Sequence, residues 1–277
     1  MNMSKISVYG GTGFIGGTFC KMFPEEVVLI ARNNKEPKTN EVLYFISTTT
    51  NQSVFSDLHT DIDTNLSIFV DVLKKCKNKN ITFNFISSGF VYGNDILDAK
   101  ETDCCNPTGF YSITKRCAEQ LLVSYCETFE IKYRILRIGN VYGLDKTISS
   151  GKNVFGFMVN LLKENKDINL YGGGKFLKDY MFVDDVCRAI KVVTEKGNYN
   201  EIYNISSGTS MIFVDIIQSA KDMIQSKSSL ISIPFPVEQE YIQIKNMTLN
   251  IDKLKCLEFN SLMNFDCELK KLCLTLL

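Results

Sequence analysis

The chain has 277 residues, of which 45% are apolar and 22% are charged. This composition is typical of a globular protein with a full core and excludes a chain that is disordered over most of its length. Thirty-one Lys and Arg residues balance thirty-one Asp and Glu residues, so a broad electrostatic attraction to nucleic acid or to a membrane surface is not expected.

Strands and helices are predicted to alternate over the first half of the chain. Short, continuously apolar runs, typical of parallel strands buried on both faces, occur at Ile6–Tyr9, Val27–Ala31, Glu41–Ser47, Ile81–Ile86 and Tyr133–Ile138. Apolar residues at helical spacing predict helices at Thr18–Phe23, Asp63–Cys76 and Tyr111–Phe129. The alternation predicts an α/β fold, a doubly wound parallel sheet with helices on both faces.

The connection between the second and third apolar runs is short. Only about ten residues, many of them polar, separate Val27–Ala31 from Glu41–Ser47. A doubly wound sheet normally has a helix and a further strand at this place. We therefore infer a deletion here.

After about residue 140 the alternation becomes less regular. The pattern predicts helices at Phe155–Leu162, Asp184–Glu195, Phe213–Ile224 and Cys267–Leu277, and strands at Tyr180–Val183 and Ile202–Ile205. We expect one large domain over residues 1–145, completed by residues 180–200. Residues 146–179 and 206–277 are expected to form a small, partly discontinuous C-terminal lobe.

A glycine pattern lies between the first predicted strand and the first predicted helix. Glycines at 10, 13 and 16 give G-x-x-G-x-x-G, which permits a tight turn and a close approach of the backbone to a pyrophosphate at the helix N-terminus. We expect Gly10, Gly13, Phe14, Ile15 and Gly16 to bind a dinucleotide. The alternative is a glycine-rich turn without a ligand.

The end of the second apolar run bears on the choice of cofactor. An acidic residue usually binds the ribose hydroxyls of NAD at this place, but the chain has Arg32 there and no carboxylate. A guanidinium suits a 2′-phosphate. The sequence therefore favours NADP, and NAD stays the alternative.

Three polar residues form a candidate catalytic set. Tyr111 and Lys115 are four residues apart on a predicted helix and therefore share a face. An ammonium near a phenol lowers its pKa and prepares it for proton transfer. Ser88 follows the fourth strand, at the sheet edge where ligands bind, although it could equally cap a turn.

These motifs occur in a characteristic order. They are Gly10–Gly16, Ser88 with Val91–Gly93, Tyr111 with Lys115, Leu136–Gly143 and Lys178–Asp185. Together they resemble the extended short-chain dehydrogenase/reductase family, and within it the NAD(P)-dependent sugar-nucleotide epimerases, reductases and dehydratases. The resemblance covers roughly residues 5–210 and implies a Rossmann-type fold for the dinucleotide-binding domain and a substrate-binding C-terminal lobe.

The resemblance also implies roles for single residues. Tyr111 would be the general acid or base at the sugar C4 oxygen, and Ser88 would hydrogen-bond the same oxygen. Lys115 would lower the pKa of Tyr111 and bind the nicotinamide ribose. Asn140 and Lys178 would contact the sugar nucleotide. Lys178 stands where the family usually has an arginine on the diphosphate, so the bidentate contact is lost.

The residues after Ser88 narrow the reaction. The 4,6-dehydratases of the family carry Thr-Asp-Glu where this chain has Ser88-Gly89-Phe90, so the acid and base of dehydration are missing. Arg32 then favours an NADPH-dependent 4-ketosugar-nucleotide reductase over an NAD-dependent 4-epimerase. A non-catalytic NADP-binding regulatory protein is the alternative of another class, although such relatives often lose the tyrosine or the lysine.

The remaining expectations concern metals, location and assembly. Ten cysteines without a C-x-x-C pair and a single histidine, His59, predict reduced thiols and no metal site. Neither a leader sequence nor a run of 18 or so apolar residues is found, so we expect a cytoplasmic protein. In many relatives, helices matching Asp63–Cys76 and Tyr111–Phe129 form a dimer interface, which implies a homodimer. Asn65 matches a family asparagine with a structural role.

Overall fold

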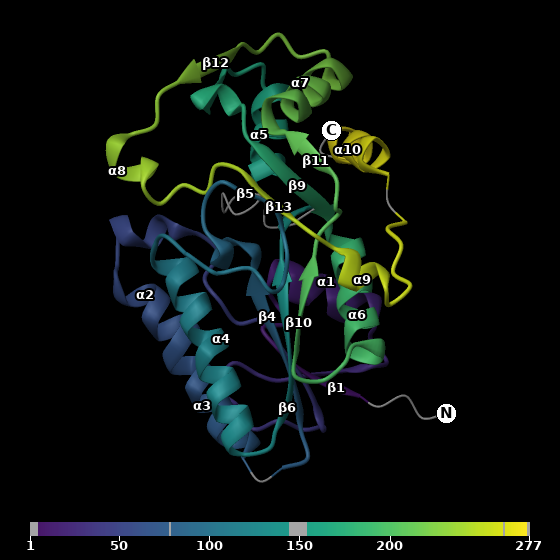
Figure 1. Ribbon diagram of the computed structural model, residues 1–277. Helices are drawn as coiled ribbons and strands as arrows, with labels where there is room; N and C mark the ends of the chain where they lie inside the picture. The colour runs from purple at the N-terminus through teal and green to yellow at the C-terminus, as the bar shows by residue number, and fades with distance from the viewer. Residues whose placement is uncertain (1–4, 78, 144–153, 263, 276–277) are drawn as a thin grey trace.

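The computed structural model describes residues 5–77, 79–143, 154–262 and 264–275. A six-stranded sheet forms the centre of the larger part of the molecule (Figure 1). Its strands, in spatial order, are β10 (Glu201–Ile205), β6 (Lys132–Ile138), β4 (Thr82–Ser88), β3 (Glu41–Tyr44), β1 (Ile6–Tyr9) and β2 (Val27–Leu29). All neighbouring strands pair in parallel, which confirms the predicted doubly wound sheet.

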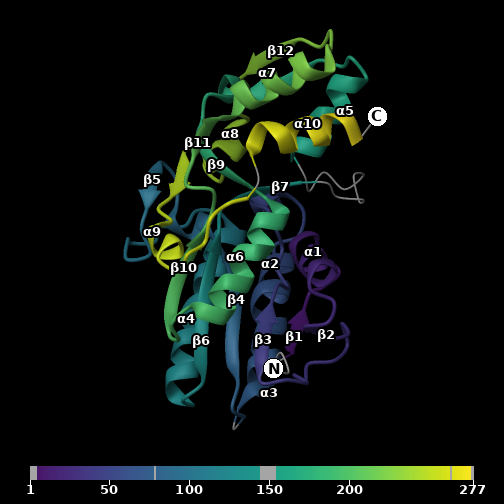
Figure 2. The same ribbon diagram turned by 90° about the vertical axis from the view of Figure 1, so that its right-hand side faces the viewer.

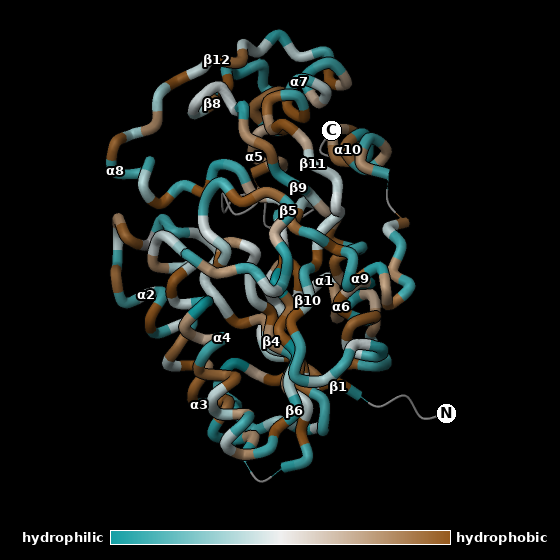
Figure 3. Tube along the Cα trace, in the orientation of Figure 1, coloured by the Kyte–Doolittle hydropathy of each residue, from teal (hydrophilic) through white to brown (hydrophobic). Residues whose placement is uncertain are grey.

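Helices cover both faces of this sheet (Figures 1 and 2). Helices α1 (Phe14–Met22) and α6 (Val183–Lys196) pack together on one face. The other face is covered by α4 (Phe110–Thr128) and by a continuous helical segment consisting of α2 (His59–Ile62), the π-helical η2 (Asp63–Ser67) and α3 (Ile68–Cys76). Apolar residues line both interfaces with the sheet (Figure 3).

Helix α1 begins earlier than the sequence predicted. The prediction was Thr18–Phe23, but the helix starts at Phe14 and includes Gly16. A Cβ atom at position 16 would lie 2.5 Å from the carbonyl oxygen of Gly10. The glycine that looked like part of a loop is therefore a helical residue, which allows the helix to pack closely on the preceding turn.

Strand β2 differs from the prediction in its environment. The run Val27–Ala31 was expected to be buried on both faces, but β2 is shorter and forms the edge of the sheet. Leu29 is 54% exposed. Residues 30–40 then cross to β3 without a helix or a strand, as the inferred deletion predicted. In the six-stranded sheet, no strand of the described residues pairs with the outer edge of β2.

The second part of the molecule contains a mixed sheet and a small helical layer (Figure 1). The sheet has the order β11 (Ser210–Ile212), β9 (Leu177–Phe182), β13 (Met247–Leu249) and β5 (Ile96–Ala99), and β7 (Asn140–Tyr142) also pairs with β9. Helices α5 (Val154–Lys163), α7 (Phe213–Ile224) and α10 (Phe265–Thr275) share an apolar core. Strands β8 (Ile168–Tyr171) and β12 (Leu230–Ile233) form a parallel pair.

Strands from the first half of the chain join the sheet of the lobe. Strands β5 and β7 lie within residues 1–145 but pair with the lobe, and β9 crosses the predicted boundary near residue 180. Short elements complete the chain: η1 (Asn51–Phe55), η3 (Gly89–Tyr92), η5 (Gly172–Gly174), α8 (Val237–Glu240) and α9 (Asp252–Lys255). The carboxyl ends of β1 and β4 therefore lie next to the lobe (Figure 1).

Candidate active site

The loop between β1 and α1 fits a dinucleotide pyrophosphate. Gly10 has a φ of +78°, and a Cβ atom there would lie 3.0 Å from the backbone nitrogen of Ile46. Gly13 is the N-cap of α1, whose first turn, starting with Phe14 and Ile15, contains no acidic residue. The free N–H groups and the positive dipole end of the helix therefore face no carboxylate of their own turn, which favours an anionic ligand.

Arg32 follows the carboxyl end of β2. Its side chain is exposed, and neighbouring Ala31 and Asn33 carry no charge. The guanidinium is therefore accessible to a phosphate, as the NADP prediction requires, and the preference for NADP over NAD stays a prediction.

Ser88 and Tyr111 come from different elements and meet in the structure. Ser88 is the last residue of β4, and Tyr111 lies in the first turn of α4; both are buried. A side-chain hydrogen bond joins the two, and the Ser88 hydroxyl also accepts a 3.2 Å hydrogen bond from the backbone N–H of Phe90. The family resemblance implied that both side chains act on the same sugar oxygen, and that role stays a prediction.

The phenol of Tyr111 is protonated at neutral pH. Burial raises the pKa of Tyr111 to about 12, the hydrogen bond with Ser88 acts in the opposite direction, and the charge of Asp61 raises it further. Desolvation outweighs the other influences on this pKa, and the predicted lowering of the Tyr111 pKa by Lys115 stays a prediction. A protonated phenol is the form that donates a proton.

Lys115 lies one turn after Tyr111 on α4 and is almost fully buried. Its ammonium donates a 2.6 Å hydrogen bond to the carbonyl oxygen of Ile86 and lies 4.2 Å from the ring centre of Phe85. Burial lowers the pKa of Lys115 to about 7. Small changes in its surroundings therefore change its charge near neutral pH.

The ring of Phe90 connects Tyr111 with the lobe. It meets the Tyr111 ring edge to face, with centroids 6.2 Å apart, and the Lys178 ammonium lies 5.9 Å from its centre. Lys178 donates a 2.9 Å hydrogen bond to the carbonyl oxygen of Ile244, and burial lowers the pKa of Lys178 to about 8. The structure thus brings Lys178 into the neighbourhood of the predicted catalytic residues.

Asn140 has a partner within the protein. Its amide donates a 3.1 Å hydrogen bond to the backbone carbonyl of Asp179 and thereby joins β7 to β9. The side chain is half-buried. A contact between Asn140 and a sugar nucleotide stays a prediction.

Asn65 has the structural role that the sequence predicted. Its amide oxygen accepts hydrogen bonds from the Ser47 hydroxyl and the Thr48 backbone N–H, at 3.0 and 2.9 Å. Its amide nitrogen donates to the hydroxyls of Thr48 and Thr114, at 2.8 and 2.9 Å. Asn65 therefore ties the segment after β3 to the part of α4 between Tyr111 and Lys115.

Two residues near the site were not predicted from the sequence. One is Phe90, whose position directly after Ser88-Gly89 was the available signal. The other is Asn51, which donates to the carbonyl oxygens of Thr108 and Ile242 and accepts from the Ser112 backbone N–H, at 3.3, 3.0 and 3.3 Å. Asn51 fixes the start of α4, and no local pattern marks it.

Other features of the described residues lie apart from this set. No group of three or more His, Cys, Asp or Glu side chains among them could hold a metal, and His59 is exposed beside Asp57. All ten cysteines are free. No helix in the described ranges combines the length and apolar character that a membrane span requires.

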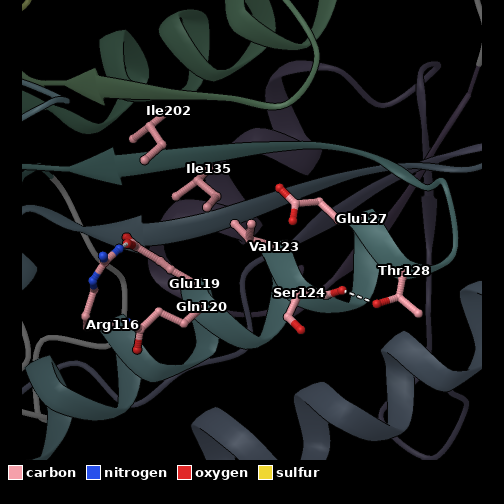
Figure 4. Close-up of a pocket in the computed structure, with 9 residues that line it drawn as sticks. All are labelled: Arg116, Glu119, Gln120, Val123, Ser124, Glu127, Thr128, Ile135 and Ile202. Carbon is pink, nitrogen blue, oxygen red and sulfur yellow. Dashed lines mark hydrogen bonds and ion pairs between the residues drawn. The ribbon is translucent and has the colours of Figure 1, made fainter.

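A groove of about 650 Å³ follows the side of α4 that faces β6 and β10 (Figure 4). It is lined by Arg116, Glu119, Gln120, Val123, Ser124, Glu127, Thr128, Ile135 and Ile202. None of the predicted site residues lines it, although Arg116 and Glu119 follow Lys115 on α4.

Comparison with known proteins identifies the family. The model of the NAD dependent epimerase/dehydratase family matches residues 38–206. A dTDP-D-glucose 4,6-dehydratase of Dictyostelium discoideum is 28% identical over 158 residues, which are 52% of this chain and 36% of that protein. A dTDP-4-dehydro-6-deoxyglucose reductase of Escherichia coli is 26% identical over 142 residues, 51% of this chain and 45% of that protein. The matches therefore span less than half the length of these relatives.

A solved structure shares the whole fold. The UDP-glucose 4-epimerase of Thermotoga maritima, determined with UDP-glucose, superimposes with a TM-score of 0.85 and 22% identity, covering 96% of each chain. Together with the family match, this agrees with the resemblance carried by the glycine loop and by Ser88, Tyr111 and Lys115. The chain belongs to the NAD dependent epimerase/dehydratase family, a group of extended short-chain dehydrogenases/reductases.

Proposed function

We propose that the chain is an NAD(P)-dependent oxidoreductase that acts at C4 of a nucleotide-activated hexose or deoxyhexose. Its specific reaction is proposed to be the NADPH-dependent reduction of a 4-ketosugar nucleotide. The observation that carries this proposal is the hydrogen bond between buried Ser88 and Tyr111, with the Lys115 ammonium one helical turn further on.

The residues of this set divide the work of the reduction. When bound, the dinucleotide supplies the hydride that reduces C4. Tyr111 gives its proton to the C4 oxygen as the carbonyl becomes a hydroxyl, and Ser88 donates a hydrogen bond to that oxygen. Lys115, as an ammonium, stabilises the phenolate that Tyr111 becomes and binds the ribose of the dinucleotide. Solvent then returns the proton to Tyr111.

The surroundings of Ser88 speak against dehydration. A Cβ atom at Gly89 would lie 3.2 Å from side-chain atoms of both Met247 and Leu249. A carboxylate at this position would therefore need space that these apolar side chains fill, and it would lose its hydration. Phe90 likewise provides no acid or base, although the Dictyostelium relative is named a dehydratase.

Arg32 favours the reductase over the epimerase. A reductase consumes its hydride and commonly uses NADPH, whose 2′-phosphate suits an accessible guanidinium. The Escherichia coli relative bears the name of a 4-dehydro-6-deoxyglucose reductase. An NAD-dependent sugar-nucleotide 4-epimerase is the second candidate, because the same set can remove and return a hydride at C4, and because the fold is shared with a UDP-glucose 4-epimerase.

The retained set also favours catalysis over a regulatory role. A protein that binds NADP only as a sensor needs the glycine loop but not a buried Ser88–Tyr111 pair. Burying the Lys115 ammonium destabilises the fold, and a protein that only binds NADP would gain nothing from it. A non-catalytic NADP-binding regulator is therefore the less favoured alternative.

We also propose a homodimer through the helical segment Asp63–Cys76, which consists of η2 and α3, and through α4. Ile113 and Leu121 on α4 are 50% and 40% exposed, and Ile62, directly before Asp63, is 40% exposed. These helices lie side by side on one face of the molecule (Figure 1). A second copy packed on them would remove this apolar surface from water. Sedimentation equilibrium that gives a monomer at all concentrations would contradict this.

The identity of the cofactor separates the two catalytic candidates. Freshly purified protein is denatured, and any released dinucleotide is identified by mass spectrometry. A protein without a retained dinucleotide, which then binds NADPH more tightly than NADH, supports the reductase. Near-stoichiometric NAD⁺ overturns the reductase proposal and supports the epimerase.

A further inference from the structure

Three consecutive residues of β4 bond to three residues of α4 that are one helical turn apart. Two of these contacts belong to the catalytic set described above. The third joins the Ser87 hydroxyl to the Glu119 carboxylate, with an O–O distance of 2.6 Å. The three pairs are Ser88 with Tyr111, Ile86 with Lys115, and Ser87 with Glu119.

The Glu119 carboxylate is held from several sides. Glu119 is 0% exposed. One oxygen accepts the hydrogen bond of Ser87 and another from Arg137 Nε at 3.1 Å. The other oxygen accepts from Arg137 Nη2 at 2.9 Å and from Arg116 Nη1 at 2.8 Å. Because the fork of Arg137 binds both oxygens, the orientation of the carboxylate is fixed.

Glu119 is also the anion that acts on Lys115. Its charge opposes the effect of burial on the pKa of Lys115. Three cations, Lys115, Arg116 and Arg137, share this carboxylate. The other titratable groups that face this cluster act on neighbouring residues: Asp61 of α2 acts on Tyr111, and Tyr92 of η3 and Cys105 act on Arg137.

We propose that Glu119 is a positioning residue of this active site. Held by Ser87 and Arg137, it fixes α4 on β4 so that Tyr111 meets Ser88, and its negative charge favours the ammonium form of Lys115. It acts through Lys115 and Tyr111 and does not itself touch the substrate. The kinetic part of the test rests on the proposed function, whereas the spectroscopic part does not.

The test compares two substitutions that each remove one carboxylate paired with an arginine of β6. Glu119→Gln keeps the side-chain length and an acceptor for Ser87 but removes the charge. The matched control is Glu41→Gln, because Glu41 pairs with Arg134 at the opposite end of β6, at 3.2 Å. Glu119→Gln leaves Arg137 without this carboxylate, and Glu41→Gln leaves Arg134 without its own. Both variants therefore report the loss of stability that follows when an arginine of β6 loses its ion pair.

The first readout is the titration of Lys115 in the whole chain, without substrate. Lysine labelled with ¹³C at Cε is followed by NMR against pH, and the Lys115 resonance is assigned by its absence in Lys115→Met. We expect the titration midpoint to fall by at least about one pH unit in Glu119→Gln and to stay unchanged in Glu41→Gln. An unchanged midpoint in Glu119→Gln overturns the proposal.

The second readout is the pH profile of kcat/KM. We expect Glu119→Gln to lose about tenfold above pH 7 and little at pH 5.5, because fewer molecules carry the Lys115 ammonium at the higher pH. An equal loss at all pH values would show a purely structural role. If the wild-type chain turns over no nucleotide sugar, the proposed function fails, and the NMR titration still decides the role of Glu119.

A further variant covers the case that Glu119→Gln does not fold. In Arg137→Gln, Glu119 keeps Ser87 and Arg116 as partners, so its charge remains compensated. Without the Arg137 cation, the negative charge of Glu119 is less neutralised and stabilises the Lys115 ammonium more strongly. The titration midpoint of Lys115 is expected to rise, and a midpoint that stays in place or falls contradicts the proposal.

Discussion

The Lys115 ammonium donates a 2.6 Å hydrogen bond to the carbonyl oxygen of Ile86, two residues before the end of β4. This contact anchors the helix that carries Tyr111 to the strand that carries Ser88. It also places a titratable cation in a buried position. Lys115 therefore contributes both to the packing of α4 on β4 and to the proposed chemistry of the site.

The first prediction concerns the pH dependence of turnover. Burial lowers the pKa of Lys115 to about 7. Nearly all molecules therefore carry the Lys115 ammonium well below pH 7, and this fraction falls as the pH rises through 7. If the ammonium is the active form, log kcat/KM should decline with a slope of about −1 above pH 7. A steady-state profile from pH 5 to pH 9 measures this, and a flat profile up to pH 9 would refute it.

The second prediction separates two glycines of the same loop. A Cβ atom at Gly16 would lie 2.5 Å from the Gly10 carbonyl oxygen, whereas one at Gly13 would lie 3.4 Å from it. Gly16→Ala should therefore lower the free energy of unfolding by about 1–3 kcal/mol through overpacking. Gly13→Ala should change it by less than about 0.5 kcal/mol.

Urea unfolding of both variants checks this difference. Gly13→Ala serves as the matched control, since it adds the same methyl group three residues away on the same turn. Equal stabilities of the two variants would show that the α1 packing relaxes and that Gly16 is not required by the fold.

Much of this site could be predicted from local patterns. The glycine spacing, the helical separation of Tyr111 and Lys115, and the position of Ser88 after a strand are all short-range features. The contacts of Asn51 with Thr108 and Ile242 are not, because they join segments far apart in the chain. Such pairings depend on how the lobe packs, which no local period encodes.

The same difference between local patterns and long-range pairing applies to the fold. The buried parallel strands followed from their apolar runs, but Val27–Leu29 has such a run and still lies at the sheet edge. Burial of a strand depends on its neighbours, and β2 pairs with β1 alone in the described sheet. Strand β9 likewise begins at Leu177, three residues before the predicted start, because its pairing with β11 and β13 extends it.

The third prediction concerns a buried acid in the lobe. Asp179 is 0% exposed, and burial raises its pKa to about 6 although the Leu249 N–H donates to it at 2.9 Å. A raised carboxyl pKa means that the folded state binds this proton more tightly than the unfolded chain does. The resulting stability is complete below about pH 4 and is lost as the pH rises through 6.

Asp179→Asn mimics the protonated acid and removes this pH dependence. The stability of the variant relative to wild type should therefore increase by about 2–3 kcal/mol between pH 4 and pH 8. Urea unfolding at both pH values measures the difference. A relative stability that stays constant, or falls, would show that Asp179 is ionised in the fold at pH 4 as well.

The fourth prediction tests the cofactor preference. Arg32→Ala should weaken NADPH binding by at least about tenfold, because a charge-assisted contact with the 2′-phosphate is lost, and should change NADH binding by less than about twofold. Lys21→Ala removes an exposed cation from the last turn of α1 and is the control. Calorimetric titration with both dinucleotides gives the answer, and equal losses for NADPH and NADH would remove Arg32 from the 2′-phosphate site.

The most direct test of the central claim is NADPH oxidation in the presence of nucleotide 4-keto-6-deoxyhexoses. The account predicts stoichiometric oxidation by the wild-type chain for at least one such sugar. In Tyr111→Phe, which lacks the proton donor, turnover should fall at least about a hundredfold, with dinucleotide affinity nearly unchanged. An unimpaired Tyr111→Phe variant, or a wild-type chain that binds NADPH and reduces none of these sugars, would contradict it.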